Sequence, residues 1–196
     1  MFQKALEQVE CIKENRYRIR GRTREYTFLS LETKNVTWYD IIEVCAMTCE
    51  EAQALIQLLK KIIDVNGFLI PKQGSKSAIN IVSVFSDNDR FKVDFNRTSM
   101  IRKDKYTLLL RYGKDHGLLR IDVGGPNHTN PDGTIVPCPH IHVQTHDTGM
   151  WDAWAYSIPV VFCNVQDRID TLRQFLEYCN VNNVDSIDIS EQTEME

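Results

Sequence analysis

The sequence predicts an α+β protein with a mainly antiparallel sheet, N-terminal helices and a C-terminal helix. From Gly67 to Phe162 the chain is a series of short runs rich in β-branched and aromatic residues, separated by turn sequences such as SDND, GKDHG and NPDG. Before and after this region, apolar residues recur at three- and four-residue spacing, which is typical of amphipathic helices. Helices are therefore expected at the two ends of the chain and strands between them.

Three helices are expected before the strand-rich region. The first fourteen residues carry apolar side chains at helical spacing, namely Phe2, Ala5, Leu6, Val9 and Ile12. Two capping-box pairs, Thr37 with Asp40 and Thr48 with Glu51, predict helices at about residues 38–46 and 49–64.

Between the first two of these helices, arginines occupy alternate positions of a segment predicted to be extended: Arg16, Arg18, Arg20, Arg22 and Arg24. Alternate side chains of a strand project from one face, so these arginines are expected to form a positive face. Guanidinium groups bind phosphate and carboxylate alike, so the expected partner is a protein or ribonucleoprotein, or nucleic acid itself. An ordinary solvated strand face is the alternative interpretation.

The C-terminal part is predicted to contain one helix and an acidic tail. Asn164 and Asp167 are expected to begin the helix, with Ile169, Leu172 and Cys179 among its inward-facing residues. All charged residues of the final segment DSIDISEQTEME are acidic, so residues 183–196 are expected to be mobile. The chain is thus divided into an N-terminal appendage (1–46), an α+β body (47–182) and a tail (183–196).

The composition favours a cytoplasmic protein without a membrane partner. No apolar run approaches the roughly 18 residues that a membrane span requires, and the first residues lack the pattern of a secretory signal. In a reducing compartment, the six cysteines are better interpreted as core residues or metal ligands than as disulfides.

The five histidines all lie between His116 and His146, and three of them are in the segment PCPHIHVQTH. His140 and His142 are two residues apart with aliphatic neighbours, so on a strand both rings point to one face. Prolines on both sides keep Cys138 extended near that face, and the turn sequence NPDG can return His128 over the pair. Zinc prefers four thiolate, imidazole or carboxylate ligands, so His128, Cys138, His140 and His142 are the predicted zinc ligands.

Other assignments of the cluster stay open. Asp122 is a rival fourth ligand or an acceptor that orients a ligating imidazole, and His146 is a further rival. The His-x-His pair can also be two solvent-facing residues of an ordinary strand. His116, in the loop GKDHG, is expected at the surface.

Two catalytic interpretations compete with simple metal binding, although no catalytic residue is assigned. A metal-dependent hydrolase would have three protein ligands, an activated water and a general base such as Asp122, Asp132 or Asp147, with Trp151 and Trp154 lining a cleft. The segment HIHVQTH also resembles the motif of histidine-triad nucleotide-binding proteins, which implies that His142 attacks phosphorus and that Gln144 replaces the third histidine.

A longer resemblance covers about two thirds of the chain. The blocks LLRIDVGGPNHTNPDG, PHIHV, MWDAWAYSIP and RQFLEYCNV, preceded by TCEEAQALIQLLKK, resemble an uncharacterised bacterial and phage-associated protein family from residue 47 to residue 181. The resemblance marks eight positions as matching the family pattern: Asp122, His128, Asn130, Asp132, His140, His142, Trp154 and Ala155. Cys138 and His146 are less typical of that pattern, and the arginine-rich segment lies outside it.

The expected function is therefore that of a small zinc-binding protein that acts by binding a macromolecular partner. The phage-type resemblance implies one concrete version, an anti-CRISPR-like inhibitor of a host defence nuclease. A metal-dependent hydrolase or a histidine-triad-like phosphotransferase is the alternative. Four protein ligands on the metal favour the binding protein, whereas three ligands and a water favour the enzyme.

Overall fold

The computed structural model describes residues 9–13, 16–19, 25–27, 47–64, 66–145 and 150–191. The chain forms two compact units, residues 1–46 and residues 47–196, and each is described by itself. Several predicted features lie outside the described residues: the helix at 38–46, Arg20, Arg22, Arg24, His146 and Asp147.

The described part of the first unit is a three-stranded antiparallel sheet of β1 (Val9–Lys13), β2 (Arg16–Ile19) and β3 (Glu25–Thr27), in that order. The helix predicted for the first fourteen residues is therefore wrong for residues 9–13. The segment VECIK contains β-branched residues and pairs with β2, and such pairing overrides a short helical spacing. Arg16 and Arg18 lie on β2 as expected of an extended segment.

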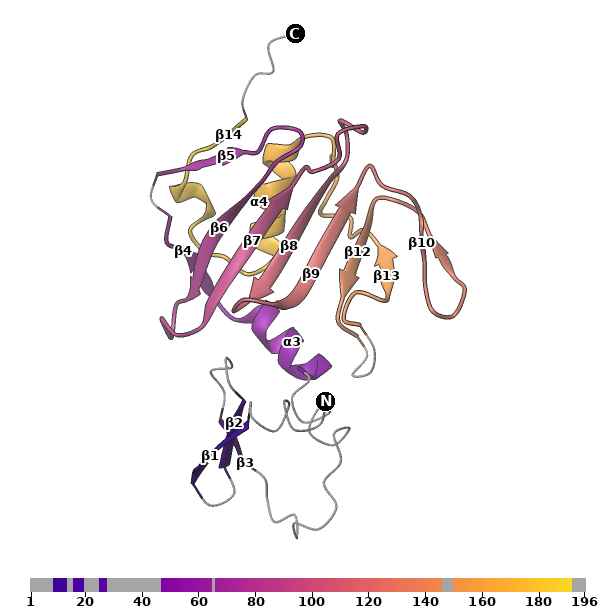
Figure 1. The fold of residues 1–196 in the computed structure, drawn as a ribbon. Helices are drawn as coiled ribbons and strands as arrows, with labels where there is room; N and C mark the ends of the chain where they lie inside the picture. Colours follow the sequence, from indigo (N-terminus) through magenta and orange to yellow (C-terminus); the bar gives the residue numbers. More distant parts are fainter. Residues whose placement is uncertain are drawn as a thin grey trace. The chain divides into compact units, whose positions relative to one another are not determined.

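A seven-stranded sheet dominates the second unit, in the order β13-β12-β9-β8-β7-β6-β4 (Figure 1). Every neighbouring pair in it is antiparallel, as the sequence predicted. Its strands are β4 (Lys60–Ile62), β6 (Lys76–Ser83), β7 (Arg90–Asn96), β8 (Tyr106–Tyr112), β9 (His116–Val123), β12 (His140–Val143) and β13 (Ala155–Ser157).

Two small sheets accompany the large one. The strands β10 (His128–Thr129) and β11 (Ile135–Val136) form an antiparallel hairpin. The strands β5 (Phe68–Ile70) and β14 (Ile189–Glu191) pair in parallel.

The helices α3 (Cys49–Gln57) and α4 (Arg168–Tyr178) supply part of the core, and a short 3-10 helix, η1 (Val184–Ser186), follows α4. Buried residues of both helices join one apolar cluster with buried residues of β7, β8 and β9. Figure 1 shows α4 behind the sheet. Two of the predicted caps are present: Thr48 and Glu51 form a capping box, and Asp167 caps α4 by accepting from the Asp170 N–H at 3.0 Å. The predicted pair Thr37 and Asp40 lies outside the described residues.

The helix predicted for residues 49–64 ends earlier, at Gln57, because the chain turns into β4. The side chain of Lys60 is fully buried, and its ammonium group donates to the carbonyls of Ile56, Leu58 and Cys179 at 2.7, 2.6 and 2.8 Å. These bonds satisfy carbonyls at the end of α3 and bind α3 to the end of α4, which local spacing does not reveal.

The tail expected to be mobile from residue 183 is packed on the body over residues 183–191. The side chains of Val184, Ile187 and Ile189 are buried, and β14 pairs with β5. The carboxylate of Glu191 forms ion pairs with Arg97 and Arg168. Apolar residues between the acidic ones therefore hold this segment on the body, while residues 192–196 lie outside the described part.

Within the described residues, no helix has an apolar stretch of the length that a membrane crossing needs.

Candidate metal centre

The candidate site lies on the sheet face opposite the helices. On β9 and β12, Ile121 and Ile141 belong to the apolar core, so the residues beside them point to the opposite face. The strand register places His140 across from Asp122, and His142 across from Arg120. Two imidazoles, a carboxylate and a guanidinium therefore share a small area of this face.

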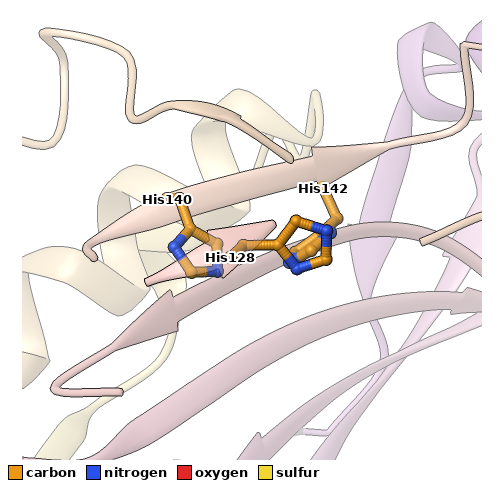
Figure 2. A group of neighbouring side chains, drawn as sticks. All are labelled: His128, His140 and His142. Atoms are coloured by element: carbon orange, nitrogen blue, oxygen red, sulfur yellow. The ribbon is translucent and has the colours of Figure 1, made fainter. Parts of the chain in front are cut away.

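The third imidazole comes from the hairpin β10–β11. The turn predicted at residues 130–133 is present: the Gly133 N–H donates to the Asn130 carbonyl at 2.9 Å, and Gly133 has a φ of 85°. Positive φ favours glycine at this position. The hairpin places His128 beside His140 and His142, with ring centroids 5.8 and 4.8 Å away (Figure 2).

Within the described part of the chain, these three histidines form a group suited to hold a metal ion. One ring nitrogen from each lies within 4.8 Å of the others. His140 and His142 are buried, with 3% and 0% of their surface exposed, and His128 is half-buried. Metal-binding histidines commonly cluster in this way, with the rings directed toward one point.

Backbone carbonyls fix the protonation of all three rings. His128 Nε2 lies 2.9 Å from the Ala153 carbonyl, His140 Nδ1 lies 3.3 Å from the Pro137 carbonyl, and His142 Nδ1 lies 3.0 Å from the Trp154 carbonyl. A carbonyl oxygen only accepts, so each of these nitrogens carries the proton. In the neutral rings, His128 Nδ1, His140 Nε2 and His142 Nε2 therefore keep free lone pairs, as a metal requires.

Asp122 brings a carboxylate to the same place. Its Oδ2 lies 3.2 Å from His142 Nε2 and 3.6 Å from His140 Nε2. Arg120 donates to this oxygen through Nε at 3.1 Å and contacts it through Nη2 at 3.0 Å, while its Nη1 donates to Asp152 at 2.6 Å.

Two polar atoms of this group are left without partners. His142 Nε2 and Asp122 Oδ1 are both buried, and neither has a hydrogen-bond partner among the residues that the structure describes. Such atoms are rare in folded proteins, because burial of an unpaired polar atom is costly. A cation bound between the rings and the carboxylate would satisfy a lone pair of this kind.

The electrostatics keep the group ready to bind a cation. Burial lowers the pKa of His140, and this effect exceeds the opposing influence of the Asp122 charge. For Asp122, burial raises the pKa, but the neighbouring His142 and Arg120 together outweigh it, so the net pKa is below its usual range. At neutral pH, therefore, His140 is uncharged and Asp122 is ionised.

Cys138, the fourth predicted ligand, is placed outside the histidine group. Its Sγ accepts from the Gly125 N–H at 3.1 Å and lies 3.5 Å from the Asp122 carbonyl oxygen. The structure thus brings together His128, His140 and His142 of the predicted ligands, with Asp122 next to them. Cys138 was predicted as a ligand because it is two residues from His140. That spacing does not determine the direction of its side chain, which points to Gly125 and the Asp122 carbonyl.

Other residues of the catalytic hypotheses have different surroundings. Asp132 is exposed and accepts from the Thr134 N–H at 2.9 Å in the hairpin turn. Gln144 is buried, and its side-chain amide donates to the Met47 carbonyl. Trp151 packs closely on Gly117, with its ring centroid 5.8 Å from the Arg120 guanidinium carbon.

The sequence predicted Trp154 only as a residue lining a cleft, and it did not predict that residues 152–155 orient the groups of this site. Ala153 and Trp154 present the carbonyls that orient His128 and His142, and Asp152 binds Arg120. Any residue type can supply a backbone carbonyl, so the sequence does not reveal this role; the family resemblance marked Trp154 and Ala155 without assigning it.

Comparisons with known proteins bear on residues 47–181. No curated protein and no solved structure matches the sequence. A family model described as a family of unknown function (DUF6978) matches residues 47–181, which include the whole candidate centre. This confirms the expected resemblance to an uncharacterised family over these residues, while its bacterial or phage origin stays an expectation. The chain belongs to the DUF6978 family.

Proposed function

We propose that the body of this protein binds one zinc ion through His128 Nδ1, His140 Nε2 and His142 Nε2, with Asp122 as the fourth ligand. The observation that carries the proposal is the orientation of the three rings. Each has one ring nitrogen within hydrogen-bond distance of a backbone carbonyl, and one ring nitrogen of each lies within 4.8 Å of those of the other two. Imidazole and carboxylate are ligands that zinc prefers.

The spacing of the ligand atoms supports the carboxylate as a member of the set. With zinc–ligand bonds of about 2.0–2.1 Å and tetrahedral angles, two ligand atoms lie about 3.3 Å apart. The distances from Asp122 Oδ2 to His142 Nε2 and His140 Nε2 are 3.2 and 3.6 Å. The histidine nitrogens, which lie within 4.8 Å of one another, would approach by small side-chain rotations.

A centre of this kind would fasten the hairpin β10–β11 to the large sheet. The hairpin has little apolar surface of its own to bury: Ile135 is 62% exposed, while Val136 is 7% exposed. A bond from His128 to a metal held by β9 and β12 replaces the missing apolar contact. Because such a site forms only in the folded protein, the free energy of metal binding adds to the free energy of unfolding. The proposed role of the ion is therefore structural.

With four protein ligands on the ion, we propose that the protein acts by binding a macromolecule. The arginine-rich segment of the N-terminal unit, with Arg16 and Arg18 on β2, is the proposed contact for an acidic protein or for nucleic acid. Charge reversal at Arg16 and Arg18 is expected to abolish binding to a nucleic acid of mixed sequence at low salt. Binding that survives the double reversal would remove these residues from the interface.

A metal-dependent hydrolase is the second candidate, and the position of Arg120 favours it. Arg120 already contacts Asp122 Oδ2 twice, which can hold the carboxylate off the metal. The fourth position would then belong to a water molecule, and Asp122 would accept its proton. The histidine-triad alternative receives no support from Gln144, whose amide bonds to Met47.

Cobalt substitution tests the proposal and separates the two candidates. Apo protein titrated with Co²⁺ is expected to show the intense visible bands of a four-coordinate ion at about one ion per chain. The variant Asp122→Asn is expected to weaken binding and to shift these bands. Intense four-coordinate bands that Asp122→Asn leaves unaltered would favour the hydrolytic centre, in which a water molecule is the fourth ligand. Failure to bind either Co²⁺ or Zn²⁺ would refute both.

A further inference from the structure

The side chain of Asn130 forms a two-point clamp on the edge strand β13. Its Nδ2 donates to the Ala155 carbonyl at 3.2 Å, and its Oδ1 accepts from the Ala155 N–H at 2.8 Å. Both residues are buried, with 7% of Asn130 and 1% of Ala155 exposed. The carboxamide thus supplies one donor and one acceptor, as the backbone of a neighbouring strand would.

Asn130 and Ala155 are both close in sequence to residues of the metal centre. Asn130 follows His128 by two residues on the same hairpin. Ala155 follows Ala153 and Trp154, whose carbonyls accept the ring protons of His128 and His142 at 2.9 and 3.0 Å. A shift of Ala155 relative to Asn130 would therefore displace the two carbonyls that set the orientation of two rings.

We propose that Asn130 is a positioning residue of the metal centre. By fixing the Ala155 backbone, it places the carbonyls of Ala153 and Trp154 so that His128 Nδ1 and His142 Nε2 point into the centre. Its role rests on the proposed zinc centre and extends it beyond the atoms that touch the ion. Groups that orient metal ligands commonly change metal affinity 10- to 100-fold when they are removed.

The chain contains a matched control at the opposite edge of the same sheet. There Asn183 clamps Ile62 of β4 in the same way, with its Oδ1 accepting from the Ile62 N–H at 2.7 Å and its Nδ2 donating to the Ile62 carbonyl at 3.1 Å. Removal of either side chain breaks two bonds to an edge strand. β13 pairs with β12, which carries two of the proposed ligands, whereas β4 pairs with β6.

The experiment compares Asn130→Ala, Asn183→Ala and the wild type as full-length proteins. Each is stripped of metal, and the Zn²⁺ dissociation constant is measured by competition with a chromogenic chelator. The visible spectrum of the Co²⁺ form is recorded in parallel, because a merely structural loss would leave it unaltered. Asn130→Ala is expected to weaken Zn²⁺ binding by about 10- to 100-fold and to shift the Co²⁺ bands. Asn183→Ala is expected to keep the wild-type affinity and spectrum.

The outcomes distinguish a failure of the proposed role of Asn130 from a failure of the proposed zinc centre. Equal affinities and spectra for Asn130→Ala and Asn183→Ala, whether both normal or both reduced, would overturn the role of Asn130 while leaving the centre intact. A wild-type protein that binds neither ion would overturn the centre itself. If Asn130→Ala does not fold, Asn130→Asp decides, because it keeps an acceptor for the Ala155 N–H and loses the donor to the carbonyl. The same loss of affinity is expected, and wild-type affinity would refute the inference.

Discussion

Removal of the hairpin's proposed ligand by His128→Ala should abolish most of the stabilisation expected from the zinc centre that we propose. His128 is the proposed ligand on β10–β11, whereas His140 and His142 lie on the sheet itself. Without it, the ion no longer links the hairpin to β9 and β12. The variant is expected to fold, since His128 lies outside the apolar core cluster.

The size of the effect follows from mass action. Free zinc at 100 times the dissociation constant stabilises the wild type by about 2.7 kcal/mol, which for a chain of this size raises Tm by about 5–11 °C. Loss of a ligand is expected to weaken binding at least 100-fold. At the same free zinc, the variant would then gain at most about 0.4 kcal/mol.

Thermal unfolding with and without zinc measures this difference, with His116→Ala as the control. His116 begins β9 and lies outside the three-histidine group. The control is expected to keep the full zinc-dependent rise in Tm. An equal rise for wild type and His128→Ala would refute the proposed link between hairpin and sheet.

Four further predictions concern pH and packing. Burial lowers the pKa of Lys60 to about 8, so between pH 8 and 9 the unfolded chain binds more protons than the folded one. The free energy of unfolding, measured with urea, should therefore rise by about 1 kcal/mol over this pH range. The variant Lys60→Met should lack this rise. Acid should release zinc, because protons compete for the imidazoles. A chelator assay at decreasing pH measures this release. In the apo protein, burial lowers the pKa of His140, so below about pH 6.5 the unfolded chain binds more protons than the folded one. The free energy of unfolding of the apo protein should therefore decrease as the pH is lowered, which urea unfolding measures. Gly117→Ala should cost about 1–3 kcal/mol in urea unfolding, because an added Cβ would lie 2.2 Å from the Trp151 ring; an unchanged midpoint would contradict that packing.

Much of the second unit could be predicted from local pattern. The strands show alternation or apolar runs, Thr48 and Asp167 cap the helices that they were expected to begin, and the NPDG turn forms the hairpin. The clustering of His128, His140 and His142 required only strand periodicity and that turn. These features depend on residues close together in the sequence, which is why the sequence reveals them.

The features that sequence analysis missed depend on distant partners. Lysine is common in helices, yet Lys60 lies in the strand β4. Its ammonium group donates a hydrogen bond to the carbonyl of Cys179, which is distant in the sequence. Residues 183–191 look like an acidic tail, but Ile189 pairs with Phe68. The Asn130 clamp and the carbonyls that orient the rings likewise require the fold, because polar side chains of this type are equally common in exposed turns.

The most direct test of the proposed centre is the zinc content of protein purified without a metal-affinity tag. Elemental analysis of the wild type should give about one zinc ion per chain, and the double variant His140→Ala/His142→Ala should contain none. A wild type without zinc, or a double variant with the same zinc content as the wild type, would contradict the assignment of this cluster as a zinc centre.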